Sequence, residues 1–167
     1  AVAQTVFDQL FAAGAVAEFM LAVEQRAKKD GDTVATVGQL TVPNGSINVV
    51  PGRCQFSIDL RAPSNAQRDA AEADLLSALA DICVRRKVSY ALTESMRASA
   101  APSAPDLQAR WETAVTQLGL PMHRMPSGAG HDAMKLHKVM PQAMLFVRGQ
   151  NAGISHNPLE STTSDDM

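Results

Sequence analysis

The strictest constraint on the fold is an alternating segment over residues 53–61. Polar or charged side chains occupy every second position, and the positions between them are apolar: Cys54, Phe56, Ile58 and Leu60. Successive side chains of a strand point to opposite faces, so this pattern predicts a strand with one buried and one exposed face. Such a strand is typical of an antiparallel sheet that is covered on one side.

A predicted helix follows this strand at once. Ser64 and Gln67 have the spacing of a capping box, in which the two side chains satisfy backbone N–H groups at the start of a helix. Apolar residues then recur at helical spacing: Leu75, Leu76, Leu79, Ile82 and Cys83. The basic run at residues 85–87 suits the negative end of the helix dipole, so we expect the helix to end there.

The segments on either side of this pair extend the pattern. Thr5 and Asp8 have capping-box spacing and are followed by apolar residues at helical spacing, so residues 5–29 are predicted to be a helix. Residues 33–42 and 88–97 are predicted as strands, and residues 47–50 as extended chain. The predicted fold class is α/β in the broad, α+β sense: a ferredoxin-like β-α-β-β-α-β sandwich that lacks its first strand.

An Ala/Pro/Ser-rich segment at residues 100–105 is predicted to be a linker between two parts, residues 1–99 and 106–167. The second part is predicted to contain a helix capped by Ser103 and Asp106, a short helix from Ala133, a strand over 143–147 and a loop over 148–163. The chain does not begin with Met, and it stops at Ser164-Asp165-Asp166-Met167, which is typical of a helix start. We therefore expect a fragment of a longer protein.

Composition argues against two classes of partner. The net charge is −2 with both signs scattered, so no basic patch for nucleic acid is predicted. The most apolar early segment, residues 10–23, is too short to span a membrane and contains Gly14 and Glu18, so we expect a cytoplasmic protein. Cys54 and Cys83 lie far apart among apolar residues, which favours two buried thiols over a disulfide.

The segment Pro126–Met134 is a candidate for chemistry. Two glycines flank Ala129, and His131 and Asp132 follow immediately. Glycine lets backbone N–H groups approach a ligand closely, and a histidine at the start of a helix could donate or accept a proton. From local chemistry alone, a tight turn with a surface histidine is the simpler interpretation.

Three further residues stand out. Arg61 ends the alternating strand on its polar face, where a guanidinium can grip a carboxylate, and Asn48 can add a donor and an acceptor. His156 lies in a loop rich in Gly and Pro after an apolar segment, a position that suits a metal ligand. The simpler alternatives are an exposed arginine, a turn asparagine and a loop histidine.

Several segments, taken together, resemble the amidase, hydantoinase and carbamoylase family of the dinuclear zinc peptidase clan. This group contains N-carbamoyl-L-amino-acid hydrolase, allantoate amidohydrolase and β-ureidopropionase. The segments are Thr36-Val37-Gly38, Asn48-Val49-Val50-Pro51-Gly52, Phe56-Ser57-Ile58-Asp59-Leu60-Arg61, Pro126–Met134 and Gly153-Ile154-Ser155-His156-Asn157-Pro158. The form Gly-Ala-Gly-His-Asp-Ala is typical of the ureido-cleaving branch.

The resemblance implies roles for individual residues. His156 corresponds to the last metal ligand of the family. Asn48 and Arg61 correspond to residues of a lid domain that bind the carboxylate end of the substrate. His131 corresponds to a catalytic-site histidine that holds the substrate near the metals, and the backbone of Gly128, Ala129 and Gly130 lines the same pocket.

The resemblance also implies an architecture. Residues 1–99 correspond to most of the lid domain, through which members of this family form homodimers. Residues 106–167 correspond to the C-terminal part of an α/β zinc-peptidase-like catalytic domain, and residues 100–105 link the two parts.

The activity implied is hydrolysis of a C–N bond in a linear amide or ureido compound that carries a carboxylate, by water that a pair of divalent metal ions activates. Zinc is the expected metal; manganese, cobalt and nickel are compatible with the one ligand in view. The family's other metal ligands and its catalytic glutamate have no counterpart in this chain. The alternative is therefore a catalytically inactive lid or dimerisation module, or a truncated product.

Overall fold

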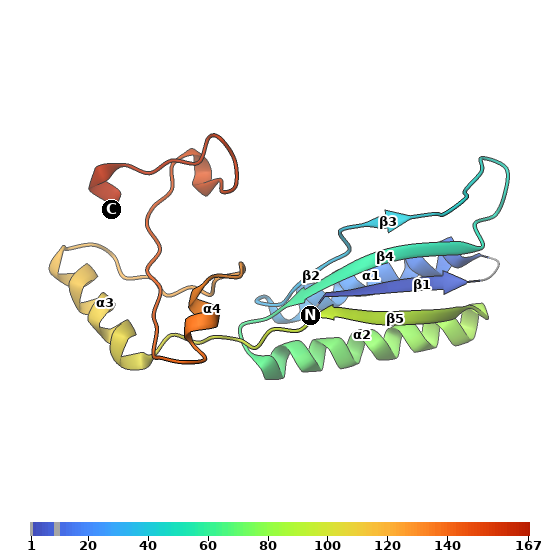
Figure 1. The fold of residues 1–167 in the computed structure, drawn as a ribbon, viewed down its shortest axis with the longest axis horizontal. Helices are drawn as coiled ribbons and strands as arrows, with labels where there is room; N and C mark the ends of the chain where they lie inside the picture. The colour runs from blue at the N-terminus through green and yellow to red at the C-terminus, as the bar shows by residue number, and fades with distance from the viewer. Residues whose placement is uncertain (1, 9–10) are drawn as a thin grey trace. The chain divides into compact units, whose positions relative to one another are not determined.

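The computed structural model describes residues 2–8 and 11–167, which divide into two compact units (Figure 1). The sheet unit comprises the chain up to Pro102 together with Met125–Met134. The C-terminal unit comprises Ser103–Arg124 and Lys135–Met167. The chain therefore crosses between the units on both sides of the segment Met125–Met134, which contains the glycine-rich stretch.

Among the described residues, five strands form one antiparallel sheet in the sheet unit: β1 (Val2–Asp8), β2 (Val34–Thr36), β3 (Leu40–Thr41), β4 (Arg53–Arg61) and β5 (Ser89–Met96). The order is β2-β4-β1-β5, and β3 also pairs with β4. β1 is a central strand, because it pairs with β4 on one side and β5 on the other. The bounds predicted for β4 are confirmed, and β5 lies within the predicted strand.

The prediction of a helix from residue 5 is wrong at its start, because residues 2–8 form β1 and the helix α1 runs over Ala12–Asp30. Residues 9 and 10 of the predicted helix lie outside the described residues. Pairing along both edges satisfies the backbone of β1, a gain that outweighs the local capping signal of Thr5 and Asp8. The prediction that the first strand is missing is wrong for the same reason.

Two smaller predictions in this unit are also wrong. The strand predicted over 33–42 is divided into β2 and β3, and residues 37–39 between them are in neither strand. Residues 47 and 48, predicted to be extended, form a turn in which the N–H of Val49 donates to the carbonyl oxygen of Ser46 at 3.4 Å. Pro43-Asn44-Gly45 precedes this turn, and Asn44 has a left-handed φ of 56°.

The helix α2 (Asn65–Arg86) confirms the helix that was predicted directly after the alternating strand. The Ser64 hydroxyl oxygen caps it, accepting a hydrogen bond from the backbone N–H of Gln67 at 3.2 Å. Both α1 and α2 pack on the face of β4 that carries its apolar residues (Figure 1). Ion pairs join the helices: Arg26 Nε to Asp74 at 2.7 Å, and Arg86 Nε to Glu18 at 2.6 Å.

The hydrophobic core lies between the helices and the sheet. Its buried residues are Ala12, Ala15, Val16, Phe19, Val23, Cys54, Phe56, Ile58, Leu60, Ala71, Leu75, Leu79, Ile82, Cys83 and Val88. The rings of Phe19 and Phe56 pack with centroids 5.7 Å apart. Cys54 and Cys83 are both buried and not bonded to each other, as predicted, and burial raises the pKa of each thiol.

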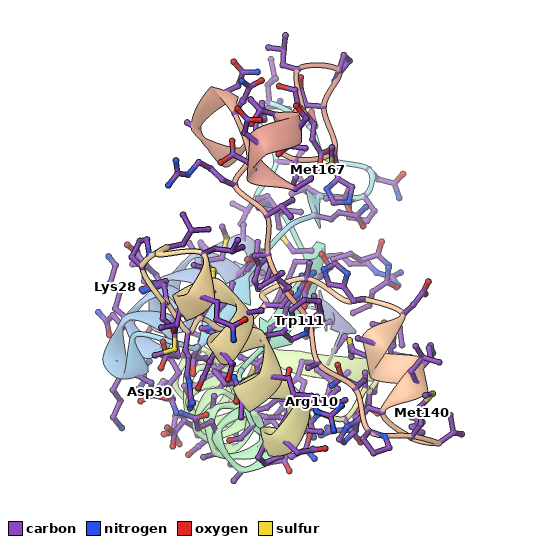
Figure 2. The ribbon with its side chains drawn as sticks, turned by 90° about the vertical axis from the view of Figure 1, so that its left-hand side faces the viewer. Lys28, Asp30, Arg110, Trp111, Met140 and Met167 are labelled. Atoms are coloured by element: carbon purple, nitrogen blue, oxygen red, sulfur yellow. The ribbon has the colours of Figure 1, made fainter. Side chains whose placement is uncertain are left out.

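The C-terminal unit contains α3 (Pro105–Gln117), most of which lies at the surface with Arg110 and Trp111 marked in Figure 2. Pro105 begins the helix without a side-chain cap, so the predicted capping by Ser103 and Asp106 is wrong. A short helix α4 (Ala133–Leu136) begins in the sheet unit and ends in the C-terminal unit. Two 3₁₀ turns, η1 (Asn151–Gly153) and η2 (Ser164–Asp166), follow. The Thr163 hydroxyl caps the last turn by accepting a hydrogen bond from the backbone N–H of Asp166.

The strand predicted over 143–147 is absent from the structure, where these described residues are irregular. A strand needs a neighbour for its backbone groups, and the residues described in the C-terminal unit provide none. Leu145, Phe146 and Val147 are accordingly about half exposed. No helix formed by the described residues is both long enough and apolar enough to cross a bilayer.

Candidate substrate-binding site

Arg61 is the last residue of β4, on the polar face of that strand. Its guanidinium contacts Asp59, which lies two residues earlier on the same face: Nε donates to Asp59 Oδ1 at 3.1 Å and Oδ2 at 3.0 Å, and Nη2 donates to Oδ2. The Arg61 side chain is 52% exposed. Hydrogen bonding and then charge attraction from Asp59 raise the pKa of Arg61, so the guanidinium is a permanent cation.

The same guanidinium reaches the glycine-rich segment. Arg61 Nη1 donates to the carbonyl oxygen of Gly128 at 2.7 Å. A guanidinium has five N–H donors, and these contacts use three of them, one on each nitrogen. One N–H on Nη1 and one on Nη2 therefore have no partner among residues 2–8 and 11–167.

The glycine-rich segment is held by short-range bonds. The backbone N–H of Ala129 donates to Ser127 Oγ at 3.3 Å, and that hydroxyl donates to the carbonyl of Ala129 at 3.2 Å. Neither Gly128 nor Gly130 has a positive φ. A methyl group at Gly128 would meet nothing within 4 Å, so the backbone at this residue has open space beside it.

Replacing Gly128 with Ala should therefore leave the stability of the chain nearly unchanged, or raise it by up to about 1 kcal/mol, because alanine restricts the unfolded chain. Urea unfolding followed by circular dichroism measures this. A loss of more than about 1 kcal/mol would mean that the backbone at residue 128 needs a conformation closed to alanine. Gly153→Ala is the contrasting variant. Gly153 has φ +72°, so alanine at this position should destabilise the chain.

His131 follows the glycines in an exposed position. Its carbonyl oxygen accepts a hydrogen bond from the backbone N–H of Met134 at 2.9 Å, and its ring has no hydrogen-bond partner within the part of the chain that the structure describes. The helix that follows, α4, has only four residues, so its dipole contributes little at this place. The ring is available for a ligand but is not oriented by a neighbour.

Asn48 is not brought to Arg61 by a hydrogen bond among the described residues. It lies in the exposed turn between β3 and β4, where its Oδ1 accepts a hydrogen bond from Ser46 Oγ at 2.9 Å. The predicted pairing of Asn48 with Arg61 on a common ligand stays a prediction.

His156 belongs to the C-terminal unit, in a loop closed by its own hydrogen bonds. Its φ of 56° is left-handed, and its backbone N–H donates to Glu160 Oε2 at 2.8 Å. Ser155 Oγ lies 3.1 Å from Nδ1 of the imidazole, which leaves Nε2 as the outward nitrogen. The loop is joined at its base by the Gln150 N–H, which donates to the Ser161 carbonyl at 2.8 Å.

A metal pair does not fit the described residues by themselves. Across residues 2–8 and 11–167, no group of three His, Cys, Asp or Glu side chains could hold a metal ion. His156 is exposed and could serve as one ligand. His131 belongs to the sheet unit. The described residues therefore offer one candidate ligand and not a complete centre.

Sequence reasoning missed Asp59. The alternation over 53–61 placed Asp59 and Arg61 on one face, two residues apart, which is the distance at which strand side chains on the same face are neighbours. Opposite charges at that spacing were the signal that could have found the pair. Glu160, which holds the backbone of His156, carried no comparable local signal.

The comparisons with known proteins agree on one family. The model of peptidase family M20/M25/M40 matches residues 10–167. The chain is 36% identical over 152 residues to an N-carbamoyl-L-amino acid amidohydrolase of Geobacillus stearothermophilus, covering 91% of this chain and 37% of that protein. It is 35% identical over 130 residues to an allantoate amidohydrolase of Bacillus subtilis, covering 77% and 31% respectively.

A solved structure gives the same result. An amidase of the hydantoinase/carbamoylase family from Burkholderia multivorans matches with a TM-score of 0.88 and 27% sequence identity, covering 98% of this chain and 43% of that chain. The chain thus spans about a third of the length of the curated relatives it matches. The resemblance to the amidase, hydantoinase and carbamoylase group is confirmed, and the chain belongs to peptidase family M20/M25/M40.

Proposed function

We propose that this chain is the substrate-positioning part of a metal-dependent hydrolase that cleaves C–N bonds in linear amide or ureido compounds, of the N-carbamoyl amino acid or allantoate type. The observation that carries the proposal is the position of Arg61. Its guanidinium lies at the end of β4, is held by Asp59 and Gly128, and keeps two N–H groups for a ligand. The relatives named N-carbamoyl-L-amino acid amidohydrolase and allantoate amidohydrolase support the substrate class.

The role of the guanidinium in this function is recognition of an acid group. Two N–H groups remain, one on each terminal nitrogen, and each can donate to an oxygen of a carboxylate. His131, Gly130 and the open backbone at Gly128 lie in the same segment as the Arg61 contact, and we assign to them the body of the substrate. Asn48 is assigned to the same end of the substrate as Arg61. His131 is proposed to contact the reacting end.

The part of the sheet unit before the linker is proposed to be the lid domain, with residues 1–99 as lid, 100–105 as linker and 106–167 as part of the catalytic domain. The order β2-β4-β1-β5, with α1 after β1 and α2 after β4, supports a ferredoxin-like assignment. Chain division near Pro102 supports the position of the linker.

Metal chemistry in this proposal belongs to the whole enzyme. His156 is proposed as one ligand of a divalent metal pair, most simply zinc, which supplies the activated water in such hydrolases. The residues of this chain bind and orient the substrate. Because the described residues hold no group of three ligands, we expect the 167-residue chain to bind no stoichiometric metal pair and to turn over no N-carbamoyl amino acid. Metal analysis after dialysis and an ammonia-release assay measure both, and clear turnover would contradict the division of roles.

The lid is further proposed to form a homodimer through β5. This strand ends the sheet order, and every one of its eight residues is exposed. An exposed edge of this length is a template for pairing with a second copy.

Ala91→Lys combined with Thr93→Lys should therefore shift the chain toward monomer. The register places both residues on the same face as Gln55 and Ser57, away from the core, so the fold of one copy is retained. Like charges on paired edges cost roughly 1 kcal/mol each, so the dissociation constant should rise at least about tenfold. Light scattering after size exclusion measures it; Gln55→Lys combined with Ser57→Lys, on the central strand β4, is the control.

The experiment that tests the proposed function compares two ligands. N-carbamoylglycine and N-carbamoylglycinamide share the ureido group, and only the first has a carboxylate. In a nuclear magnetic resonance titration of the 167-residue chain, N-carbamoylglycine should shift the signals of Arg61 and Gly128, and the amide should bind at least about tenfold more weakly. Equal binding of the two compounds would refute carboxylate recognition.

A further inference from the structure

Asp59 places a negative charge inside a site that is proposed to bind an anion. Its carboxylate contacts Arg61 through both oxygens. Charge alone makes Asp59 unfavourable for a carboxylate ligand: two like charges about 6 Å apart in water weaken binding by about threefold. The presence of this acid next to the binding cation requires a compensating effect.

The geometry supplies that effect, because Asp59 lies on a strand that has a hydrogen-bonded neighbour on each side. β4 is paired on both sides, and Asp59 is in register with Val2 of β1 and Thr36 of β2. Its side chain is 32% exposed, against 52% for Arg61. The carboxylate occupies the edge of the guanidinium formed by Nε and Nη2, while the Gly128 carbonyl holds Nη1 from a different segment. Two fixed acceptors thus define the plane of the guanidinium.

We propose that Asp59 is a positioning residue that orients Arg61 for an incoming carboxylate, an inference that rests on the proposed function. An unrestrained arginine loses rotamer entropy when it binds, a cost of up to about thirtyfold in affinity, and Asp59 removes most of that cost beforehand. The benefit exceeds the threefold loss from repulsion. Removing Asp59 should therefore weaken the binding of an anion, although it removes a negative charge.

The sign of this effect separates positioning from simple electrostatics. With N-carbamoylglycine as the probe, Asp59→Ala should bind about tenfold more weakly than the natural chain. Asp59→Asn keeps one oxygen that can accept from Arg61, so it should restore part of the loss. Asp74→Ala breaks another Arg–Asp contact, that of Arg26, and should leave binding unchanged.

A second measurement reads the orientation of Arg61 directly. The Nε–H signal of Arg61 should be sharp and slow to exchange in the natural chain and in Asp59→Asn, and broadened in Asp59→Ala. Binding by Asp59→Ala that is equal to or tighter than the natural chain would overturn the inference, as would an unchanged Nε–H signal. Failure of the proposed function is a different result: the natural chain itself would then not prefer N-carbamoylglycine over its amide.

Discussion

Replacing Phe19 with Ala should lower the free energy of unfolding of the sheet unit by about 3–5 kcal/mol, which is the usual cost of removing a buried phenylalanine. Phe19 lies on α1 and is 1% exposed. Its side chain belongs to the core between the helices and the sheet. Its ring packs against Phe56 on β4. The substitution thus removes the largest fully buried side chain of the core and leaves a cavity that a paired strand and a long helix cannot fill.

Urea unfolding followed by the amide signals of β4 measures this loss in the sheet unit itself. Leu21→Ala is the matched control: it lies two residues away on the same helix with 59% of its surface exposed, so it should change stability by no more than about 0.5 kcal/mol. Equal effects of the two substitutions would show that α1 does not cover the sheet through Phe19.

The strand and helix from residue 53 to residue 86 were predictable because their signals are local. Alternation fixed the buried face of β4, and the Ser64 cap fixed the start of α2. β1 was not predictable in this way, because its conformation depends on β4 and β5, which lie about 50 and 85 residues further along the chain. Residues 143–147 failed for the converse reason: an apolar, strand-like segment found no neighbour among the described residues.

The residues of the candidate site show the same difference between local signals and contacts distant in the sequence. The sequence identified Arg61 and Gly128 separately, and the structure joins them through one hydrogen bond across 67 positions of the chain. The sequence did not identify the role of Asp59, because a charged residue on the polar face of a strand is ordinary until its partner is known. His156 and Asn48 stood out from local chemistry and were given roles by the resemblance, and those roles depend on a ligand or a metal that contacts them.

Arg61→Ala should weaken the binding of N-carbamoylglycine to the chain by about 1.5–3 kcal/mol, which is the range for a hydrogen bond to a charged group. That range corresponds to a dissociation constant about tenfold to 150-fold higher. The fold should persist, because the hydrogen bonds that Arg61 donates to Asp59 and Gly128 come from a half-exposed side chain and stabilise the fold little. Arg61→Lys should recover only part of the affinity, since an ammonium cannot present two fixed N–H groups.

The control for this prediction is Arg53→Ala, which removes an equal charge from the other end of β4. Arg53 lies on the same polar face, eight residues and about 26 Å away along the strand. If net charge alone attracted the ligand, the two substitutions would weaken binding equally, and both effects would vanish at high salt. If Arg61 binds the carboxylate directly, only its loss matters, the loss persists at high salt, and binding of N-carbamoylglycinamide stays the same in all variants. Unchanged affinity in Arg61→Ala would contradict carboxylate binding by Arg61, on which the proposed function rests.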